Sequence, residues 1–241
     1  MKRKGKMEDL VIESQYLQEA LTVKIYVPEG FSPFHDYQLC IMQDGDDYFR
    51  IGRIATLSDQ LHASMEIEPT IFIGIHYQDR YDRLDKYHPD GKLQKKYIDF
   101  LIREVIPSLE EKLHITPPLS YTLMGDSLAG TLAFMIASSY PSTINKVVMQ
   151  SPFVNETVLK KIRETNQLQR LKVYHSVGTE ETDVKITTGG EVLDFLAENR
   201  TFQHLLANKV SDYTYEEFNG DHTWTYWQQD LRKILIHMLG E

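Results

Sequence analysis

The chain has 241 residues, 41% of them hydrophobic and 25% charged, which is enough to build one sizeable core. Its formal net charge of −9 excludes nucleic acid as a partner, because the average field of the protein repels a polyanion. The single cysteine, Cys40, excludes an intramolecular disulfide, and no apolar run reaches the roughly 18 residues that a membrane span needs.

We expect a cytoplasmic protein with one domain over residues 1–241 and a frayed segment over residues 1–8. The chain starts MKRKGKMEDL, so acidic residues stand where a secretory leader would need an apolar stretch. No repeat and no Pro/Gly/Ser-rich linker divides the sequence, and no pattern indicates an oligomeric state.

The first predicted elements are two strands, over residues 9–17 and 19–30. Val23, Ile25 and Val27 recur at a period of two, and Pro28 and Gly30 end the run. This alternation predicts an antiparallel pair.

From residue 37 onward, continuous apolar runs alternate with helical patterns. The expected strands are 37–43, 70–77, 120–126, 146–152, 170–179 and 211–218. The expected helices cover 51–61, 93–113, 127–140, 189–209 (opened by glycines) and a last helix that includes 231–239. This order predicts an α/β fold with crossover connections and a mostly parallel sheet covered on both faces.

The stretch YTLMGDSLAG, residues 121–130, places a serine between a buried-strand pattern and a buried-helix pattern. It fits the nucleophile elbow G-x-S-x-G, except that Ala129 stands where the second glycine belongs. The sharp turn strains the serine backbone and requires small neighbours, a need that Gly125, Ala129 and Gly130 meet. The pattern favours Ser127 as a nucleophile; the alternative is an N-cap serine on a buried helix.

A nucleophilic serine needs a histidine base, which in α/β-hydrolases follows it late in the chain. Of the histidines after Ser127, His222 lies in a predicted loop between the last strand and the last helix. His175, His204 and His237 lie inside predicted strands or helices and are more typical of structural residues. We therefore favour His222 as the base; the alternative is a loop histidine that caps the last helix.

The acid that orients the base should follow the strand 170–179. The loop at that point carries Glu180, Glu181 and Asp183. Position is the only discriminator, and it favours Glu181, with Asp183 second and Glu180 third.

A tetrahedral oxyanion needs two backbone donors. The N–H of Leu128 is the first candidate, and the N–H of Asp46, in the turn DGDDYF, is the second because Gly45 permits an unusual backbone turn. Asp44, Asp46 and Asp47 also raise the alternative of a metal loop, but the later glycine and glutamate of an EF-hand are missing. We expect no metal and no cofactor.

Together, QDGDDYF, GDSLAG, SVGTEE and GDHTWTYW resemble the putative-esterase family of α/β-hydrolases, which includes esterase D-like enzymes and enterochelin-type siderophore esterases. The resemblance runs from about residue 20 to the end. It implies the α/β-hydrolase fold, with antiparallel N-terminal strands, helices on both faces and no large lid. It carries over Ser127 and His222 as nucleophile and base, Asp46 in the oxyanion loop, and Glu181 as the acid. Some siderophore esterases resemble Ser–His dyads, so the acid stays open.

The stretch DRYDRLDKYHPDG departs from the R-x-x-E pattern of siderophore esterases, because Lys86 replaces the glutamate. Arg80 and Arg83 are candidates for binding an anionic substrate; a solvated charged loop is the alternative. Little room for a lid exists between residues 152 and 170, so we expect an open site. Its expected aromatic walls, which are equally good core candidates, are Tyr48, Phe49, Trp224 and Trp227.

The sequence thus predicts a serine carboxylesterase that hydrolyses a small-molecule ester through an acyl-enzyme. Acyl transfer to an alcohol and non-catalytic binding on a hydrolase scaffold are the alternatives. No motif specifies the acyl group, the alcohol, or whether a siderophore lactone is the substrate.

Overall fold

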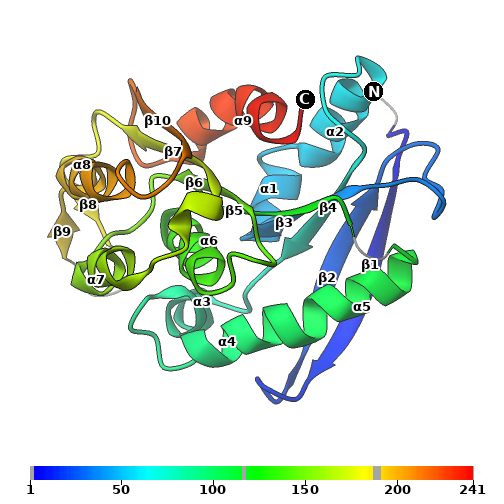
Figure 1. The fold of residues 1–241 in the computed structure, drawn as a ribbon, viewed down its shortest axis with the longest axis horizontal. Helices are drawn as coiled ribbons and strands as arrows, with labels where there is room; N and C mark the ends of the chain where they lie inside the picture. Colours follow the sequence, from blue (N-terminus) through cyan, green and yellow to red (C-terminus); the bar gives the residue numbers. More distant parts are fainter. Residues whose placement is uncertain (1–2, 116–117, 187–190, 241) are drawn as a thin grey trace.

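The computed structural model describes residues 3–115, 118–186 and 191–240. An eight-stranded sheet in the order β1-β2-β4-β3-β5-β6-β7-β10 runs through the middle of the molecule (Figure 1). Its strands are β1 Lys6–Ser14, β2 Glu19–Val27, β3 Gln38–Gln43, β4 Thr70–Ile75, β5 Ser120–Asp126, β6 Lys146–Gln150, β7 Lys172–Gly178 and β10 Asp212–Phe218. A short hairpin, β8 Val184–Lys185 with β9 Val192–Leu193, stands apart from this sheet.

The direction of the strands confirms the predicted α/β-hydrolase sheet. β1 pairs antiparallel with β2, and β2 pairs antiparallel with β4. From β4 to β10 every neighbouring pair is parallel. The carboxyl ends of these parallel strands therefore meet at one edge of the sheet, where α/β proteins place their sites.

Helices cover both faces of the sheet. On one face lie α1 Gly45–Arg50, α2 Ile54–Ala63 and α9 Trp224–Leu239. On the other lie α3 Arg80–Tyr87, α4 Gln94–Phe100, a π-helical stretch η1 Leu101–Val105, α5 Ile106–Leu113, α6 Ser127–Ser139, α7 Glu156–Glu164, the 3₁₀ turn η2 Leu168–Arg170 and α8 Phe195–Leu206.

The continuous apolar runs are explained by the two cores that they serve. In β3, Leu39 and Ile41 belong to the core under α4–α8, whereas Cys40 and Met42 belong to the core under α1, α2 and α9. Successive side chains of a strand point to opposite faces, so a strand buried on both faces must be apolar throughout.

Two expectations from the sequence need correction. The strand β1 starts at Lys6, so residues 6–8 are paired rather than frayed; Asp59 holds the amides of Lys4 and Gly5 just before it. The helix α8 starts at Phe195, capped by Asp194, because residues 192–193 form β9 first. The glycines expected to open it, residues 189–190, lie outside the described residues.

Three helices, α1, α3 and α7, were not predicted; α1 forms where the sequence indicates a turn. The charged stretch that reads as a loop from its composition forms α3, because Asp79 caps it and Lys86 is buried between Glu19 and Asp82. In α7, Asn155 supplies the cap.

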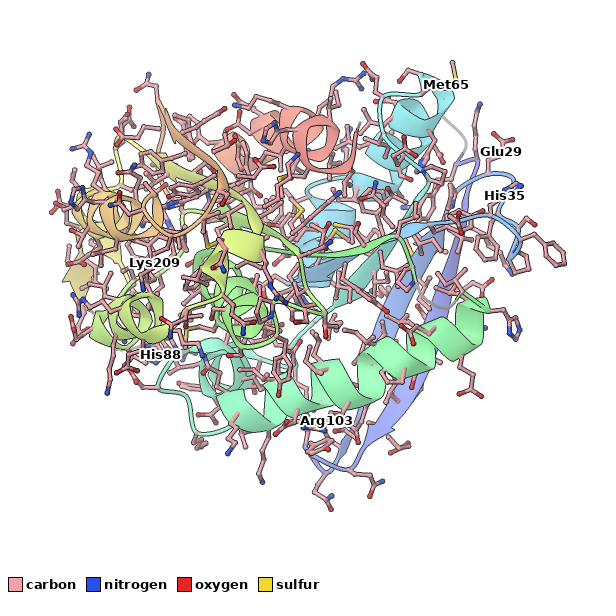
Figure 2. The ribbon with its side chains drawn as sticks, viewed as in Figure 1. Glu29, His35, Met65, His88, Arg103 and Lys209 are labelled. Carbon is pink, nitrogen blue, oxygen red and sulfur yellow. The ribbon has the colours of Figure 1, made fainter. Side chains whose placement is uncertain are left out.

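Surface side chains such as Met65, which is 89% exposed, point away from the body of the molecule (Figure 2). Within the described ranges, no helix combines the length and apolar character required to cross a bilayer.

Candidate active site

Ser127 sits at the turn between β5 and α6 with its backbone in the left-handed region, at φ 50°. A side chain on Gly125 would meet the backbone of Ala129 at 2.3 Å, so this turn accepts only glycine at that position. Ala129 is fully buried. The small residues of GDSLAG are therefore required by close packing of the turn, as the elbow pattern predicts.

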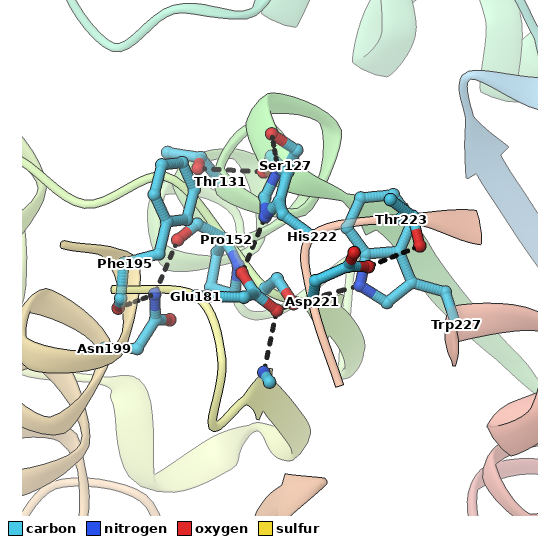
Figure 3. A network of polar contacts seen from close by, with 12 residues as sticks. Ser127, Thr131, Pro152, Glu181, Phe195, Asn199, Asp221, His222, Thr223 and Trp227 are labelled. Atoms are coloured by element: carbon cyan, nitrogen blue, oxygen red, sulfur yellow. Dashed lines mark hydrogen bonds and ion pairs between the residues drawn. The ribbon is translucent and has the colours of Figure 1, made fainter. Parts of the chain in front are cut away.

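The structure brings Ser127, Glu181 and His222 together, although the serine is 95 positions from the histidine in the chain. The Oγ of Ser127 lies 3.0 Å from Nε2 of His222, and the Nδ1 of His222 lies 2.6 Å from Oε2 of Glu181 (Figure 3). His222 is held in the loop between β10 and α9. Each residue therefore comes from a loop or turn at the same sheet edge.

The two alternative acids lie elsewhere. Glu180 and Asp183 are exposed, and the carboxylate of Asp183 accepts a hydrogen bond from Thr182. Glu181 is completely buried, and its Oε1 accepts hydrogen bonds from the amide of Gly178, at 2.7 Å, and the hydroxyl of Ser151, at 2.5 Å. Of the three carboxylates in this loop, Glu181 is the one that contacts the imidazole.

Two aromatic rings fix the plane of the His222 ring. Phe195 packs on one side with ring centroids 4.4 Å apart, and the indole of Trp227 approaches edge-on at 4.9 Å. The histidine side chain keeps 16% of its surface exposed. Solvent therefore reaches the imidazole although two aromatic rings pack against it.

The two predicted oxyanion donors lie in the first turns of two helices. Leu128 is the second residue of α6, and Asp46 is the second residue of α1. Amides of a first helical turn have no carbonyl partner within the helix, so both are available to an anion. Because β3 and β5 are adjacent and parallel, both helices begin at the same edge of the sheet.

A buried charge cluster lies behind the serine. The guanidinium of Arg83 binds both carboxylate oxygens of Asp44, at 2.6 to 3.1 Å, and reaches the carbonyl of Asp126 at 3.5 Å. Burial by itself would lower the pKa of Arg83, but the ion pair with Asp44 raises it above its ordinary value. Burial and the Asp44 charge raise the pKa of Asp126 well above its ordinary value, against the effect of Arg83.

A cavity of about 350 Å³ opens over Ser127 and His222. One wall comes from the segment 77–88, which includes α3, and the opposite wall comes from the β8–β9 hairpin and the start of α8. Its lining residues are Tyr77, Arg80, Arg83, Leu84, His88, Ser127, Leu128, Phe153, Val184, Lys185, Ile186, Glu191, Leu193, Phe195 and His222. A larger hollow of about 520 Å³, beside α2, contains none of the three residues of the Ser–His–Glu constellation.

The predicted aromatic walls are wrong in position. Tyr48 is buried and donates its hydroxyl to Gln150 at 3.0 Å, and Phe49 is buried against Gly74. Trp224 packs edge-on against Tyr48, and Trp227 is buried behind His222. Tyr48 and Phe49 belong to the core under α1, α2 and α9, and Trp224 packs against it, because these side chains point to that face of the sheet.

Of the predicted arginines, both reach the cavity, but in different states. Arg83 forms an ion pair with Asp44. Arg80 is exposed, and among the described residues its guanidinium has one polar and aromatic partner, Tyr81. The histidines predicted to be structural include His175, which is fully buried and bonded to Tyr213 and Asn199.

Sequence reasoning missed Tyr77, His88, Phe153 and Phe195 as cavity residues. Tyr77 and Phe153 follow the carboxyl ends of β4 and β6, so the general rule for parallel sheets could have identified them. His88 follows the unpredicted α3, and Phe195 begins a helix whose start was placed too early. Among the described residues, no group of three or more His, Cys, Asp or Glu side chains is arranged to hold a metal ion.

The chain is similar to known proteins in sequence and in fold. A family model described as "Putative esterase" matches residues 14–238. An uncharacterized protein of Bacillus subtilis (strain 168), YjcH, is 39% identical over 239 residues, which cover 98% of this chain and 99% of the relative.

Two solved structures illustrate the shared fold. The siderophore hydrolase EstB from Aspergillus nidulans superposes with a TM-score of 0.79 at 16% identity, covering 97% of this chain and 94% of that one. The enterobactin esterase FES from Shigella flexneri gives a TM-score of 0.79 at 15% identity over 96% of this chain, which spans 58% of the length of that enzyme. At such identities the likeness establishes the fold alone.

Proposed function

Because the chain belongs to the putative-esterase family, we propose that it is a serine carboxylesterase acting through an acyl-enzyme. Membership of the family supports esterase activity in general. The observation that carries the serine mechanism is the bonded series Ser127–His222–Glu181, with distances of 3.0 and 2.6 Å. A serine hydroxyl is a poor nucleophile at neutral pH unless a base of this kind accepts its proton.

In the proposed reaction, Oγ of Ser127 attacks the ester carbonyl carbon while Nε2 of His222 accepts the hydroxyl proton. Glu181 stabilises the resulting imidazolium and holds the tautomer with a proton on Nδ1. The amides of Leu128 and Asp46 bind the tetrahedral oxyanion. His222 then protonates the departing alkoxide, which leaves Ser127 acylated.

The second half of the cycle needs water at the same histidine. His222 removes a proton from a water molecule as the water oxygen attacks the acyl carbon. The bond between the acyl carbon and Oγ of Ser127 then breaks, His222 returns the proton to Oγ, and the carboxylic acid leaves. The partial exposure of His222 supports hydrolysis over transfer to an alcohol. An acyltransferase would instead form a new ester when a competing alcohol is supplied.

The test uses a fluorophosphonate probe and a panel of short-chain nitrophenyl esters. We expect stoichiometric labelling of the wild type, no labelling of Ser127→Ala, and loss of ester hydrolysis in the same variant. The matched control is Ser139→Ala, at the far end of α6. A folded wild type that neither reacts with the probe nor cleaves any ester would instead identify a binding protein on a hydrolase scaffold.

We further propose that Arg80 favours esters with an anionic group, because it is exposed at the cavity mouth and no ion pair of the described residues engages it. Arg80→Ala should raise KM severalfold for an ester with a distal carboxylate. The KM for an uncharged ester of the same shape should stay unchanged. Added salt should weaken the preference, because exposed charges are screened. Equal effects of the variant on both esters would exclude this role.

A further inference from the structure

We propose that Ser151 is a positioning residue of the active site. Its hydroxyl, itself held by the indole of Trp227, fixes the carboxylate of Glu181 and thereby the imidazole of His222. The inference rests on the proposed serine-hydrolase function. Neither Ser151 nor a role for Trp227 behind the acid follows from any motif in the sequence.

The contacts divide the Glu181 carboxylate into two halves with separate tasks. Oε1 accepts hydrogen bonds from Ser151 Oγ, at 2.5 Å, and from the amide of Gly178, at 2.7 Å. Oε2 is left to face Nδ1 of His222 at 2.6 Å. With Oε1 held by two donors, the carboxylate cannot rotate without breaking a buried hydrogen bond. The orientation of the acid is therefore set on the side away from the histidine.

The Ser151 hydroxyl also has its direction fixed. It accepts a hydrogen bond from Nε1 of Trp227 at 3.0 Å, so its single proton is directed to Glu181. The carbonyl of Trp227 accepts from Gln150, whose side-chain oxygen accepts from Tyr48. A continuous series of buried hydrogen bonds thus runs from α1, through the start of α9, to the acid.

The strained backbone conformation at Ser151 supports a functional role for its hydroxyl. Ser151 is completely buried and has φ 47°, a conformation in which glycine is the relaxed choice. Its amide donates to the carbonyl of Ser176 at 2.7 Å, which holds the strained turn in place. A side chain retained in such a conformation costs about 1 kcal/mol, and strained residues of this kind cluster at functional sites.

The experiment measures the rate at which a fluorophosphonate modifies Ser127, which reports activation of the nucleophile without a known substrate. Ser151→Ala should lower this rate roughly tenfold, because it removes one hydrogen bond to a buried charged group. Ser176→Ala is the matched control. It deletes a buried hydroxyl from the neighbouring strand that has no hydrogen-bond partner among the described residues, and its rate should equal that of the wild type.

Two further variants separate positioning from stability. Ser151→Gly removes the hydroxyl and the backbone strain together. The fluorophosphonate should therefore modify Ser127 slowly in this variant, although its Tm is not below that of Ser151→Ala. In a Glu181→Ala background, Ser151→Ala should cause no further loss, because its effect passes through the carboxylate.

The outcomes distinguish this inference from the function on which it rests. If the wild type is never labelled, the serine-hydrolase proposal is wrong. If the wild type is labelled and Ser151→Ala reacts at the same rate, or slows the reaction equally with and without Glu181, Ser151 does not position the acid.

Discussion

At the residue scale, close packing by neighbouring residues fixes the conformation of each side chain in the site. The small residues around Ser127 allow the sharp turn, and the two rings beside His222 fix its plane. Glu181 is selected over Glu180 and Asp183 by burial: it alone of the three is removed from water and bonded to the imidazole. An acidic loop in a sequence cannot reveal this difference, because all three carboxylates lie within four consecutive positions.

The role of the Asp46 amide can be tested by removing its hydrogen. Asp46→Pro eliminates the N–H while proline at the start of α1 retains a helical φ, so kcat should fall on the order of a hundredfold. Asp46→Ala keeps the amide and loses only the partly exposed ion pair with Lys24, so its kcat should stay near that of the wild type. Esterase assays on both variants, with circular dichroism to verify folding, make the comparison; equal kcat values would remove Asp46 from the oxyanion hole.

At the scale of elements, ion pairs rather than an apolar stripe hold α3 against the sheet. Arg83 joins the helix to the loop after β3 through Asp44, and Lys86 joins it to Glu19, the first residue of β2. These contacts place one wall of the cavity. They also explain why a stretch with few apolar residues is a helix: its stabilising partners come from distant parts of the chain.

The Arg83–Asp44 pair gives a prediction for stability. Arg83→Met leaves the buried carboxylate of Asp44 without a partner and should lower the free energy of unfolding by about 3–5 kcal/mol. The matched control is Arg200→Met, which breaks an exposed bidentate pair with Glu217 and should cost less than about 1 kcal/mol. Urea denaturation of both variants tests the contrast, and similar losses would contradict it. Replacing Asp44 by asparagine as well should recover part of the loss in Arg83→Met.

At the scale of the whole molecule, one parallel sheet brings distant loops to a single edge while two separate cores support it. α9 closes one core and also carries Trp227 behind the histidine. Stability and site geometry are therefore linked, because the same helix serves both. The antiparallel strands β1 and β2 extend the sheet away from the site.

Global stability should depend on pH through His175, a buried residue of β7. Burial lowers its pKa from 6.5 to about 4, against the opposing effect of Asn199. Between these two values the unfolded chain binds more protons than the folded one, so stability falls as the pH falls. This residue should contribute a loss on the order of 3 kcal/mol between pH 6.5 and 4.

Urea unfolding of wild type and His175→Gln across this pH range measures that contribution. The variant should show a shallower decline, whatever its stability at pH 7. His204→Gln, which alters an exposed histidine on α8, should keep the slope of the wild type. An unchanged slope in His175→Gln would mean that the buried imidazole is not the group that takes up the proton.

The sequence by itself determined the alternation of strands and helices, the antiparallel start, the elbow around Ser127 and the choice of His222 as its base, and it placed the acid among three carboxylates of one loop. These features are local: apolar period, turn residues and chain order require no knowledge of distant contacts. The structure selected Glu181 from the three carboxylates by burial. Only the tertiary structure decided that Tyr48, Phe49 and Trp227 are buried behind the site, that Arg83 is committed to Asp44, and that the hairpin before α8 forms a wall. Those outcomes depend on which face of the sheet a side chain points to and on partners more than thirty residues away. The residues next to it in the sequence specify neither.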